Sequence, residues 1–375
     1  MNVLILTPDA VGSTLLQRVL TVYMQFANFD RPVINLHELT NGLAKFYSPD
    51  FNQEIVSKKN SRWDYHQSLE EIVAMLDSVD HYKTSRLAQY HIVRRNDPLS
   101  DQMSFYNYLN ENFFIITCRR KNLFEHALSL TLARLTRLNV YYPAEKLDWY
   151  LRFYKDPVSL DLESFQHTLT AYKDYLQWCS HFNIQSYFWY EDHVPDIERF
   201  VLDLPVFSAR PKTTFKDVYG IDFATWNRCH YMQSDVGSLA LEHRQDFLQL
   251  ELEEKEYAPG GFTAQSNLTV LEKVQDRHSQ FLTQHKDNYV KAKESIEQMR
   301  KLGIMVSGLP IKKQTMAEKR FIIKNYTQCL NIYNVWAGKN PDICSPIDPD
   351  VAEQQIQQER KYWQGTDQLA IKDET

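Results

Sequence analysis

The chain is poor in glycine and lacks the cysteine patterns typical of disulfide-rich or zinc proteins. Its 375 residues include 10 glycines, whereas tyrosine (22) and phenylalanine (20) are abundant. This balance argues against a disordered chain or a glycine-rich fibre and favours a globular protein with a substantial core. The five cysteines are an odd total with no Cys-X-X-Cys. They favour free thiols in a reducing compartment over a disulfide framework or a zinc site.

Long apolar runs and an excess of positive charge are also missing. No apolar run approaches the ~18 residues that span a bilayer, and the chain starts with strand-like residues instead of a basic, cleavable leader. We therefore expect a cytoplasmic protein without membrane contact. The formal net charge is −6, so we expect no nucleic-acid partner, and any anion site must be local. The local basic clusters are Arg94–Arg95 and Arg119–Lys121.

The chain opens with a predicted strand, a tight loop and a helix. The apolar run Val3–Thr7 predicts a buried parallel strand, and apolar residues at steps of three and four predict a helix over Leu15–Phe26. Between them, Gly12 allows a tight turn, and Ser13 and Thr14 present hydroxyls where the helix begins. Such a helix N-terminus attracts phosphate or sulfate. The alternative is an ordinary capped strand–helix unit of any α/β protein.

The organisation of the chain changes near residue 235. Before it, apolar strands alternate with amphipathic helices, which predicts an α/β domain over 1–235 with a doubly wound parallel sheet. We predict a helical extension over 236–375, with helices in 267–302, 315–336 and 349–363. Three roles are open for this extension: a lid over an acceptor site, an arm that docks a partner, or helices that only add to the core. We predict that it mediates self-association or holds a protein partner.

The loop lacks the Gly-Lys-Ser/Thr of ATPases and GTPases, because Gly12 runs directly into Ser13. A kinase with a divergent phosphate loop is disfavoured for the same reason. The segment Ala10–Leu16 instead resembles the 5′-phosphosulfate loop of the sulfotransferases. These enzymes transfer a sulfuryl group from 3′-phosphoadenosine 5′-phosphosulfate (PAPS) to an alcohol, phenol or amine. The resemblance implies a P-loop-like loop in which Gly12, Ser13 and Thr14 bind PAPS; we expect no metal.

A second match follows the predicted buried strand Phe113–Cys118. The strand runs into Arg119, Arg120 and Lys121 and then into a helix. This order resembles the family's 3′-phosphate site, in which an arginine at a strand end and a serine about two helical turns later hold the nucleotide. A guanidinium offers a planar fork to phosphate oxygens. The resemblance implies that Arg119, Arg120 and Ser129 bind the cofactor; the alternative is a solvated basic turn.

A third match is the aromatic strand that ends in Tyr190, Glu191 and Asp192. It resembles the Tyr-Glu-Asp strand end of the family, with His193 where leucine is usual. Carboxylates at a strand end can orient a basic loop or cap the next helix. We expect this structural role for Glu191 and Asp192 in preference to catalysis.

The segment 81–87 resembles the family's Lys-Thr-His-Leu strand, in which the histidine takes the acceptor's proton. Lys83 matches the lysine, whereas Ser85 stands at the histidine position and is a poor base. The loop cation of the family aligns with Ala10. Its loss would remove a charge-assisted donor of the kind worth ~3–4 kcal/mol in the transition state. Arg18 or Lys83 are the candidates to replace that charge.

Candidates for the base that takes the acceptor's proton follow the predicted strand 32–36. His37 and Glu38 follow this strand, and a histidine there is suitably basic at neutral pH. The alternative is that His37 makes a local hydrogen bond and that Glu38 caps a helix. His91 and His126 rank lower, because a lone histidine is more often structural.

Together the four matches run in family order across residues 1–200. We therefore predict a divergent, bacterial or phage-type sulfotransferase that uses PAPS and a small-molecule or glycan acceptor. Its predicted catalytic residues are His37, Glu38, Lys83 and Ser85. The alternative is a catalytically degenerate sulfotransferase-fold protein with a structural or assembly role through its C-terminal helices.

Overall fold

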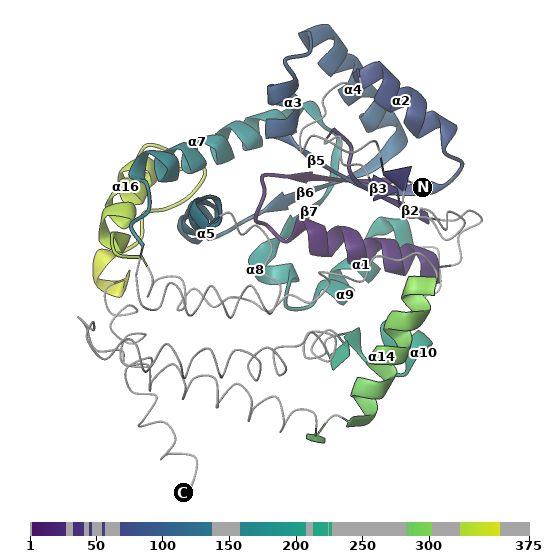
Figure 1. Ribbon diagram of the computed structural model, residues 1–375. Coiled ribbons are helices and arrows are strands. Elements are labelled where there is room, and N and C mark those ends of the chain that lie inside the picture. The colour runs from purple at the N-terminus through teal and green to yellow at the C-terminus, as the bar shows by residue number, and fades with distance from the viewer. Residues whose placement is uncertain are drawn as a thin grey trace, which may run out of the picture. The chain divides into compact units, whose positions relative to one another are not determined.

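The computed structural model describes residues 2–27, 33–40, 45–46, 55–56, 68–136, 158–207, 213–223, 225–226, 283–284, 286–301 and 323–352 (Figure 1). These residues fall into two compact units. The first unit holds the described residues up to 121 and those between 174 and 301. The second holds 122–136, 158–173 and 323–352. Helix α7 (Leu162–Trp178) contributes residues to both units.

Five parallel strands form the sheet of the first unit, in the order β2-β5-β1-β6-β7. They are β1 (Asn2–Thr7), β2 (Val33–Glu38), β5 (Tyr82–Ala88), β6 (Phe113–Arg119) and β7 (Ile184–Trp189). Val3 of β1 lies opposite Thr84 of β5 on one side and Phe114 of β6 on the other. The short strands β3 (Lys45–Phe46) and β4 (Ile55–Val56) form a separate antiparallel pair. The predicted α/β class with a parallel sheet is confirmed.

Helices cover both faces of this sheet. Because side chains alternate along a strand, Val3 and Ile5 of β1 face one layer, and Leu4 and Leu6 face the other. The first layer contains α1 (Ser13–Phe26) and α9 (Ile197–Leu202), and the second contains α2 (Leu69–Ser78) and α4 (Leu99–Asn112). In Figure 1, α2 and α4 lie above the sheet, and α1 and α9 lie below it. Both faces of β1 are therefore buried, which explains its unbroken apolar run.

The chain reverses its direction across the sheet at β1. From β1 it passes through α1 to β2, which lies beyond β5 at the sheet edge. From β5 it passes through α3 (Gln89–Arg95) and α4, across β1, to β6. The carboxyl ends of β1, β5 and β6 therefore frame a topological switch point. Open α/β sheets bind ligands at this position.

The rest of the first unit is built from short helical turns and one long helix. They are η1 (Cys179–His181), α8 (Tyr190–His193), η2 (Pro205–Phe207), α10 (Phe215–Tyr219) and α14 (Lys286–Lys301). Ala292 of α14 is fully buried, and Ser295 Oγ accepts a hydrogen bond of 2.5 Å from Trp226 Nε1. Thus α14, within the predicted extension, adds residues to the core of the first unit. The domain boundary near 235 stays a prediction, because residues 227–282 lie outside the described residues.

The second unit is held by aromatic packing between helices. It contains α5 (Leu123–Thr136), residues 162–173 of α7, and α16 (Tyr326–Gly338). The Phe124 ring packs against Phe165 at 6.0 Å and Tyr326 at 5.2 Å between ring centroids. The α16 helix matches the end of the predicted helix 315–336. Of the third predicted tail helix, residues 349–352 are helical and the remainder lies outside the described residues.

Candidate anion-binding site at the carboxyl edge of the sheet

The loop between β1 and α1 has an unusual backbone. Asp9 and Ala10 have φ values of 65° and 51°, and Gly12 has a φ of 76°. Left-handed backbone at a residue with a Cβ costs on the order of 1–3 kcal/mol, so it persists only where the surroundings enforce it. Thr7 supplies part of that support, because its Oγ1 accepts from Asp9 N at 3.2 Å and donates to Ser13 Oγ at 3.0 Å. One hydroxyl thereby joins the two ends of the loop.

The loop leads into α1, whose N-terminus has neither a cap from a described side chain nor an acidic residue in its first turn. Gly12 is the N-cap of α1, and no described side chain caps this end of the helix. The first turn has no acidic residue either. The first backbone N–H groups and the positive end of the helix dipole therefore face the switch point without a carboxylate of the helix itself. This arrangement favours an anion at the start of α1.

A buried arginine contributes a positive charge at the same place. Arg86 of β5 donates from Nη1 to Thr14 Oγ1 at 2.5 Å and to Ser13 Oγ at 3.4 Å. Its Nη2 lies 2.8 Å from Glu38 Oε1 at the end of β2, and the Arg86 side chain is 7% exposed. The same guanidinium thus holds a carboxylate and both predicted phosphosulfate hydroxyls. Arg86 was not among the site residues predicted from the sequence, although a charged residue within a buried strand indicates a functional or paired group.

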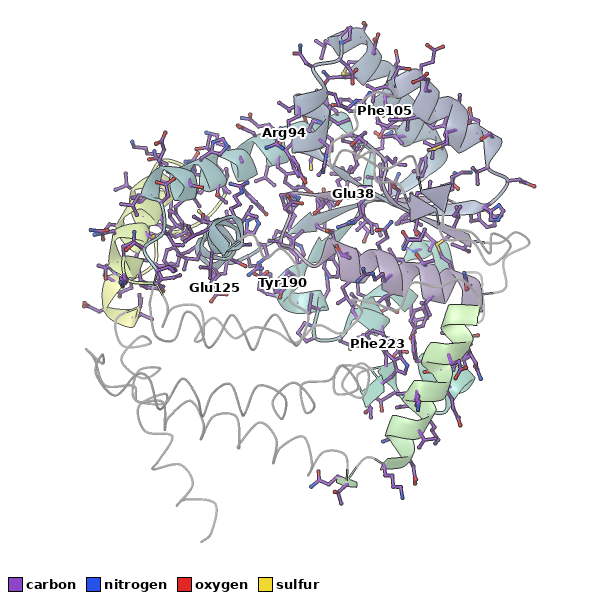
Figure 2. The ribbon with its side chains drawn as sticks, viewed as in Figure 1. Glu38, Arg94, Phe105, Glu125, Tyr190 and Phe223 are labelled. Atoms are coloured by element: carbon purple, nitrogen blue, oxygen red, sulfur yellow. The ribbon has the colours of Figure 1, made fainter. Side chains whose placement is uncertain are left out.

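Glu38 connects this arginine to a buried histidine. Its Oε2 lies 3.4 Å from His91 Nε2, and the His91 side chain is fully buried. The ring of the neighbouring Tyr90 contacts that of His91 at a tilt, with centroids 4.0 Å apart, and Arg94 lies 5.5 Å from the Tyr90 ring centre. Burial, reinforced by nearby carboxylates, raises the pKa of Tyr90 well above its usual value. Tyr90 therefore stays a neutral phenol, and the carboxyl group that pairs with Arg86 is that of Glu38. In Figure 2, the labelled residues Glu38 and Arg94 lie above Tyr190.

Arg119, the last residue of β6, and Arg120, which follows it, point in different directions. Arg120 Nε lies 2.8 Å from Glu191 Oε1, and Arg120 Nη1 donates to the carbonyl of Ala10 at 3.3 Å. Arg119 instead lies over the rings of Tyr187 and Trp189, at 4.8 and 5.9 Å. Strand alternation explains the separation, because adjacent residues project to opposite faces. The structure therefore brings Arg120 to the loop and leaves Arg119 on an aromatic surface of β7.

Glu191 and Asp192, which follow β7, bind Arg120 and Lys121. Their position at the end of the strand predicted such a contact with a basic loop. Glu191 pairs with Arg120 through Oε1 and accepts from the backbone N–H of Lys121 through Oε2, at 2.9 Å. Asp192 pairs with Lys121 Nζ at 2.7 Å. The Tyr-Glu-Asp segment itself forms the short helix α8 and not the end of the strand. Its structural role is confirmed.

The remaining predicted site residues are Lys83, Ser85, Ser129 and His37. Lys83 Nζ donates to the carbonyls of Val79 and His81, at the amino end of β5. Ser85 is fully buried, and its side chain projects from the face opposite Arg86. Ser129 belongs to α5 in the second unit. The side chain of His37 lies outside the described residues.

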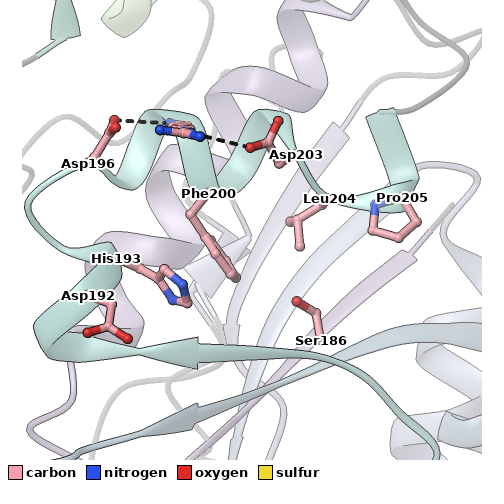
Figure 3. A pocket seen from close by; sticks show the side chains of 9 residues that line it. Ser186, Asp192, His193, Asp196, Phe200, Asp203, Leu204 and Pro205 are labelled. Carbon is pink, nitrogen blue, oxygen red and sulfur yellow. Dashed lines mark hydrogen bonds and ion pairs between the residues drawn. The ribbon is translucent and has the colours of Figure 1, made fainter.

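A separate surface pocket of about 390 Å³ runs along β7, α8 and α9 (Figure 3). The rings of His193 and Phe200 stack in its wall, with centroids 4.4 Å apart. Trp189 N–H donates to His193 Nδ1 at 2.9 Å. Burial lowers the pKa of His193; Asp192 opposes this effect, and Lys121 adds to it. The imidazole is therefore held in the neutral form that accepts the Trp189 hydrogen bond.

The described part of the chain holds neither a metal-binding cluster nor a membrane-spanning helix. Among the described residues, no cluster of three or more histidine, cysteine or acidic side chains is arranged to hold a metal ion. The described helices include none with the length and apolar character that a membrane crossing requires. The four described cysteines are Cys118, Cys179, Cys329 and Cys344, and all are free thiols, as predicted.

Comparisons of the chain with family models, with curated proteins and with solved structures returned no match. The functional assignment therefore rests on the residues and the geometry of the chain itself.

Proposed function

We propose that the protein is a sulfotransferase that moves a sulfuryl group from PAPS to a hydroxyl or amine of a small-molecule or glycan acceptor. The observation that carries the proposal is the contact of the Arg86 guanidinium with the hydroxyls of Ser13 and Thr14 at the start of α1. It joins a fixed cation, two hydroxyl donors and a helix N-terminus at the switch point. We further propose a cytoplasmic location, and self-association or partner binding through the C-terminal helices.

In this proposal Arg86 supplies the positive charge that a loop cation supplies in the sulfotransferase family, where this chain has Ala10. The acceptor oxygen or nitrogen attacks sulfur while the bond from sulfur to the 5′-phosphate oxygen breaks. 3′-Phosphoadenosine 5′-phosphate (PAP) leaves with the electron pair. Negative charge builds on the bridging oxygen and the moving group, where fixed cations and helix N–H donors stabilise it. Arg86 and the first turn of α1 fit this role, because both converge on Ser13 and Thr14.

The acceptor's proton needs a base. Of the predicted bases, Glu38 lies beside the loop, where one carboxylate oxygen holds Arg86 and the other lies 3.4 Å from His91. We propose that Glu38 takes the proton. Arg119 is the proposed ligand of the 3′-phosphate, because its buried Nε has no hydrogen-bond partner among the described residues. The role of Ser129, which belongs to the second unit, stays a prediction from the sequence resemblance.

A second candidate is a protein that binds PAP but has lost the transfer reaction. The observation that favours it is the 2.8 Å ion pair of Arg86 with Glu38, which offsets the only charge that we assign to the phosphosulfate loop. In that case the nucleotide would act as a structural ligand. Release of sulfate from PAPS separates the two candidates without knowledge of the acceptor.

The test is a calorimetric titration of the full chain with PAP and with adenosine 5′-phosphate, followed by an assay of PAPS turnover. A charge-assisted contact to the 3′-phosphate is worth ~1.5–3 kcal/mol, so PAP should bind about tenfold to a hundredfold more tightly. Arg86→Lys, which keeps charge but loses the planar fork, should weaken both nucleotides. Lys83→Met is the matched control and should bind like the wild type. Equal affinity for the two nucleotides would refute the assignment of Arg119, and no binding would refute the sulfotransferase proposal.

A further inference from the structure

The backbone of the loop needs support from outside the loop itself. Asp9 and Ala10 are consecutive residues with a Cβ in the left-handed region. Such backbone persists only where neighbouring groups enforce it. Thr7 fixes the strand side of the loop through Asp9 and Ser13. The carbonyl of Ala10 lies on the other side and points at Arg120.

Arg120 is itself held in place by three contacts. Its Nη1 donates to Ala10 O at 3.3 Å, and its Nε lies 2.8 Å from Glu191 Oε1. Its guanidinium lies 4.0 Å from the centre of the Tyr190 ring, and the side chain is 7% exposed. Glu191 also accepts from the backbone of Lys121, so it binds the side chain of one residue and the main chain of the next. The guanidinium is thereby fixed before any ligand arrives.

Helix α8 completes this support by touching the loop directly. A Cβ on Gly12 would lie 3.2 Å from a ring carbon of Tyr190 and 3.4 Å from a methyl of Val194. The same Tyr190 ring stacks on Arg120. Residues that follow β6 and β7 therefore pack against the loop that follows β1. The positive φ of Gly12 and this close approach both favour glycine at this position.

We infer that Arg120 is a positioning residue that holds the loop of residues 8–12 in its anion-binding shape, with Glu191 as its partner. The peptide between Ala10 and Val11 is planar and trans, so a carbonyl fixed on Arg120 directs the Val11 N–H the opposite way. Arg120 is already engaged by Glu191 and Ala10, whereas the buried Nε of Arg119 has no hydrogen-bond partner among the described residues, so the 3′-phosphate is assigned to Arg119. The identity of the anion, though not the support of the loop, rests on the proposed function.

Two nucleotides distinguish the roles of Arg120. PAP and adenosine 5′-phosphate share the 5′-phosphate and differ in the 3′-phosphate. If Arg120 positions the loop, Arg120→Met should weaken both nucleotides by a similar factor, about tenfold, and Arg120→Lys should recover part of the loss. If Arg120 holds the 3′-phosphate, Arg120→Met should weaken PAP alone and bring its affinity close to that of adenosine 5′-phosphate. The second result would overturn the inference. Lys121→Met is the control, because it removes an adjacent, exposed cation.

A measurement without nucleotide keeps the inference testable if the proposed function fails. Amide hydrogen exchange over residues 8–14 should become about tenfold faster in Arg120→Met, whereas exchange in β1 and β5 should stay unchanged. Glu191→Gln preserves shape and should give a smaller increase in the same segment; it replaces Arg120→Met if that variant does not fold. Unchanged exchange of the loop in a folded variant would overturn the inference. Absence of PAP binding by the wild type would count against the proposed function alone.

Discussion

Strand β5 carries two basic side chains at its two ends, and their surroundings differ. Lys83, at the amino end, gives its ammonium protons to the carbonyls of Val79 and His81, which lie in the chain just before the strand. Arg86, three residues later, contacts Glu38 of β2 and the hydroxyls at the start of α1. The first cation closes a local turn. The second joins three elements that are distant in sequence.

This difference separates a locally bonded end of the strand from one where charged groups of several elements meet. At the amino end, two backbone carbonyls accept hydrogen bonds from Lys83. At the other edge, ionised and hydroxyl groups are concentrated where α1 presents its N-terminus. Polar groups of this kind are costly to bury and are retained where they are fully hydrogen-bonded or where function needs them. Removing Arg86 and removing Lys83 should therefore change the stability and the nucleotide affinity of the protein by different amounts.

The largest effect is expected from Arg86→Ala. It leaves Glu38 buried without its cation, and breaking a buried pair in this way costs ~3–5 kcal/mol. The free energy of unfolding from urea titration should fall by that amount, and PAP binding should be lost. Because Arg86→Ala threatens folding, Arg86→Lys supplies a milder second variant. If the free energy of unfolding changed by less than ~1 kcal/mol, the Arg86–Glu38 pair would contribute no more to stability than an exposed ion pair does.

An intermediate effect is expected from Lys83→Met, which keeps the aliphatic stem and removes two hydrogen bonds. Each bond contributes a net ~0.5–1.5 kcal/mol, so the free energy of unfolding should fall by ~1–3 kcal/mol relative to the wild type. PAP affinity should stay within about twofold, because the side chain lies at the opposite end of β5 from the loop. A tenfold loss of affinity with unchanged stability would erase the contrast between the two ends.

The smallest effect concerns the carboxyl end of β7, where burial lowers the pKa of His193 below its ordinary value of 6.5. As the pH falls through 6.5, the unfolded chain binds the proton before the folded protein does, so the free energy of unfolding decreases. The decrease ends once the pH is below the folded pKa. His193→Asn keeps a hydrogen-bond acceptor but does not titrate. Urea titrations at pH 7.5, 6.5 and 5.5 should show wild-type stability falling relative to this variant; a constant difference would contradict the prediction.

The fold was accessible from the sequence because its signals are local. The apolar run of β1 and the three- and four-residue spacing of α1 each predict their element without reference to the rest of the chain. The helix α8 was not predicted, because Tyr190–His193 follow an aromatic strand without a break in composition. Likewise, a helix was predicted over the segment that includes α14, but the sequence did not indicate that α14 would contact Trp226.

The site was predictable only where its parts are consecutive in the chain. Gly12, Ser13 and Thr14 come together because a strand, a loop and a helix place them there. Arg86 was missed because the resemblance directed attention to Lys83 and Ser85, while alternation along the strand turns Ser85 away from α1. The bond from Arg120 to Ala10 spans 110 residues, and no spacing rule predicts it.

The central place of β1 also has a consequence for the synthesis of the protein. Its partners β5 and β6 end 81 and 112 residues after Thr7. At translation rates of roughly 5–20 residues per second, about 4 to 20 s pass before either partner is complete. In that interval α1 can cover Val3 and Ile5, while the opposite face of β1, with Leu4 and Leu6, stays exposed to solvent, chaperones or other nascent chains. The yield of folded protein should therefore depend on how fast the ribosome reaches Arg119.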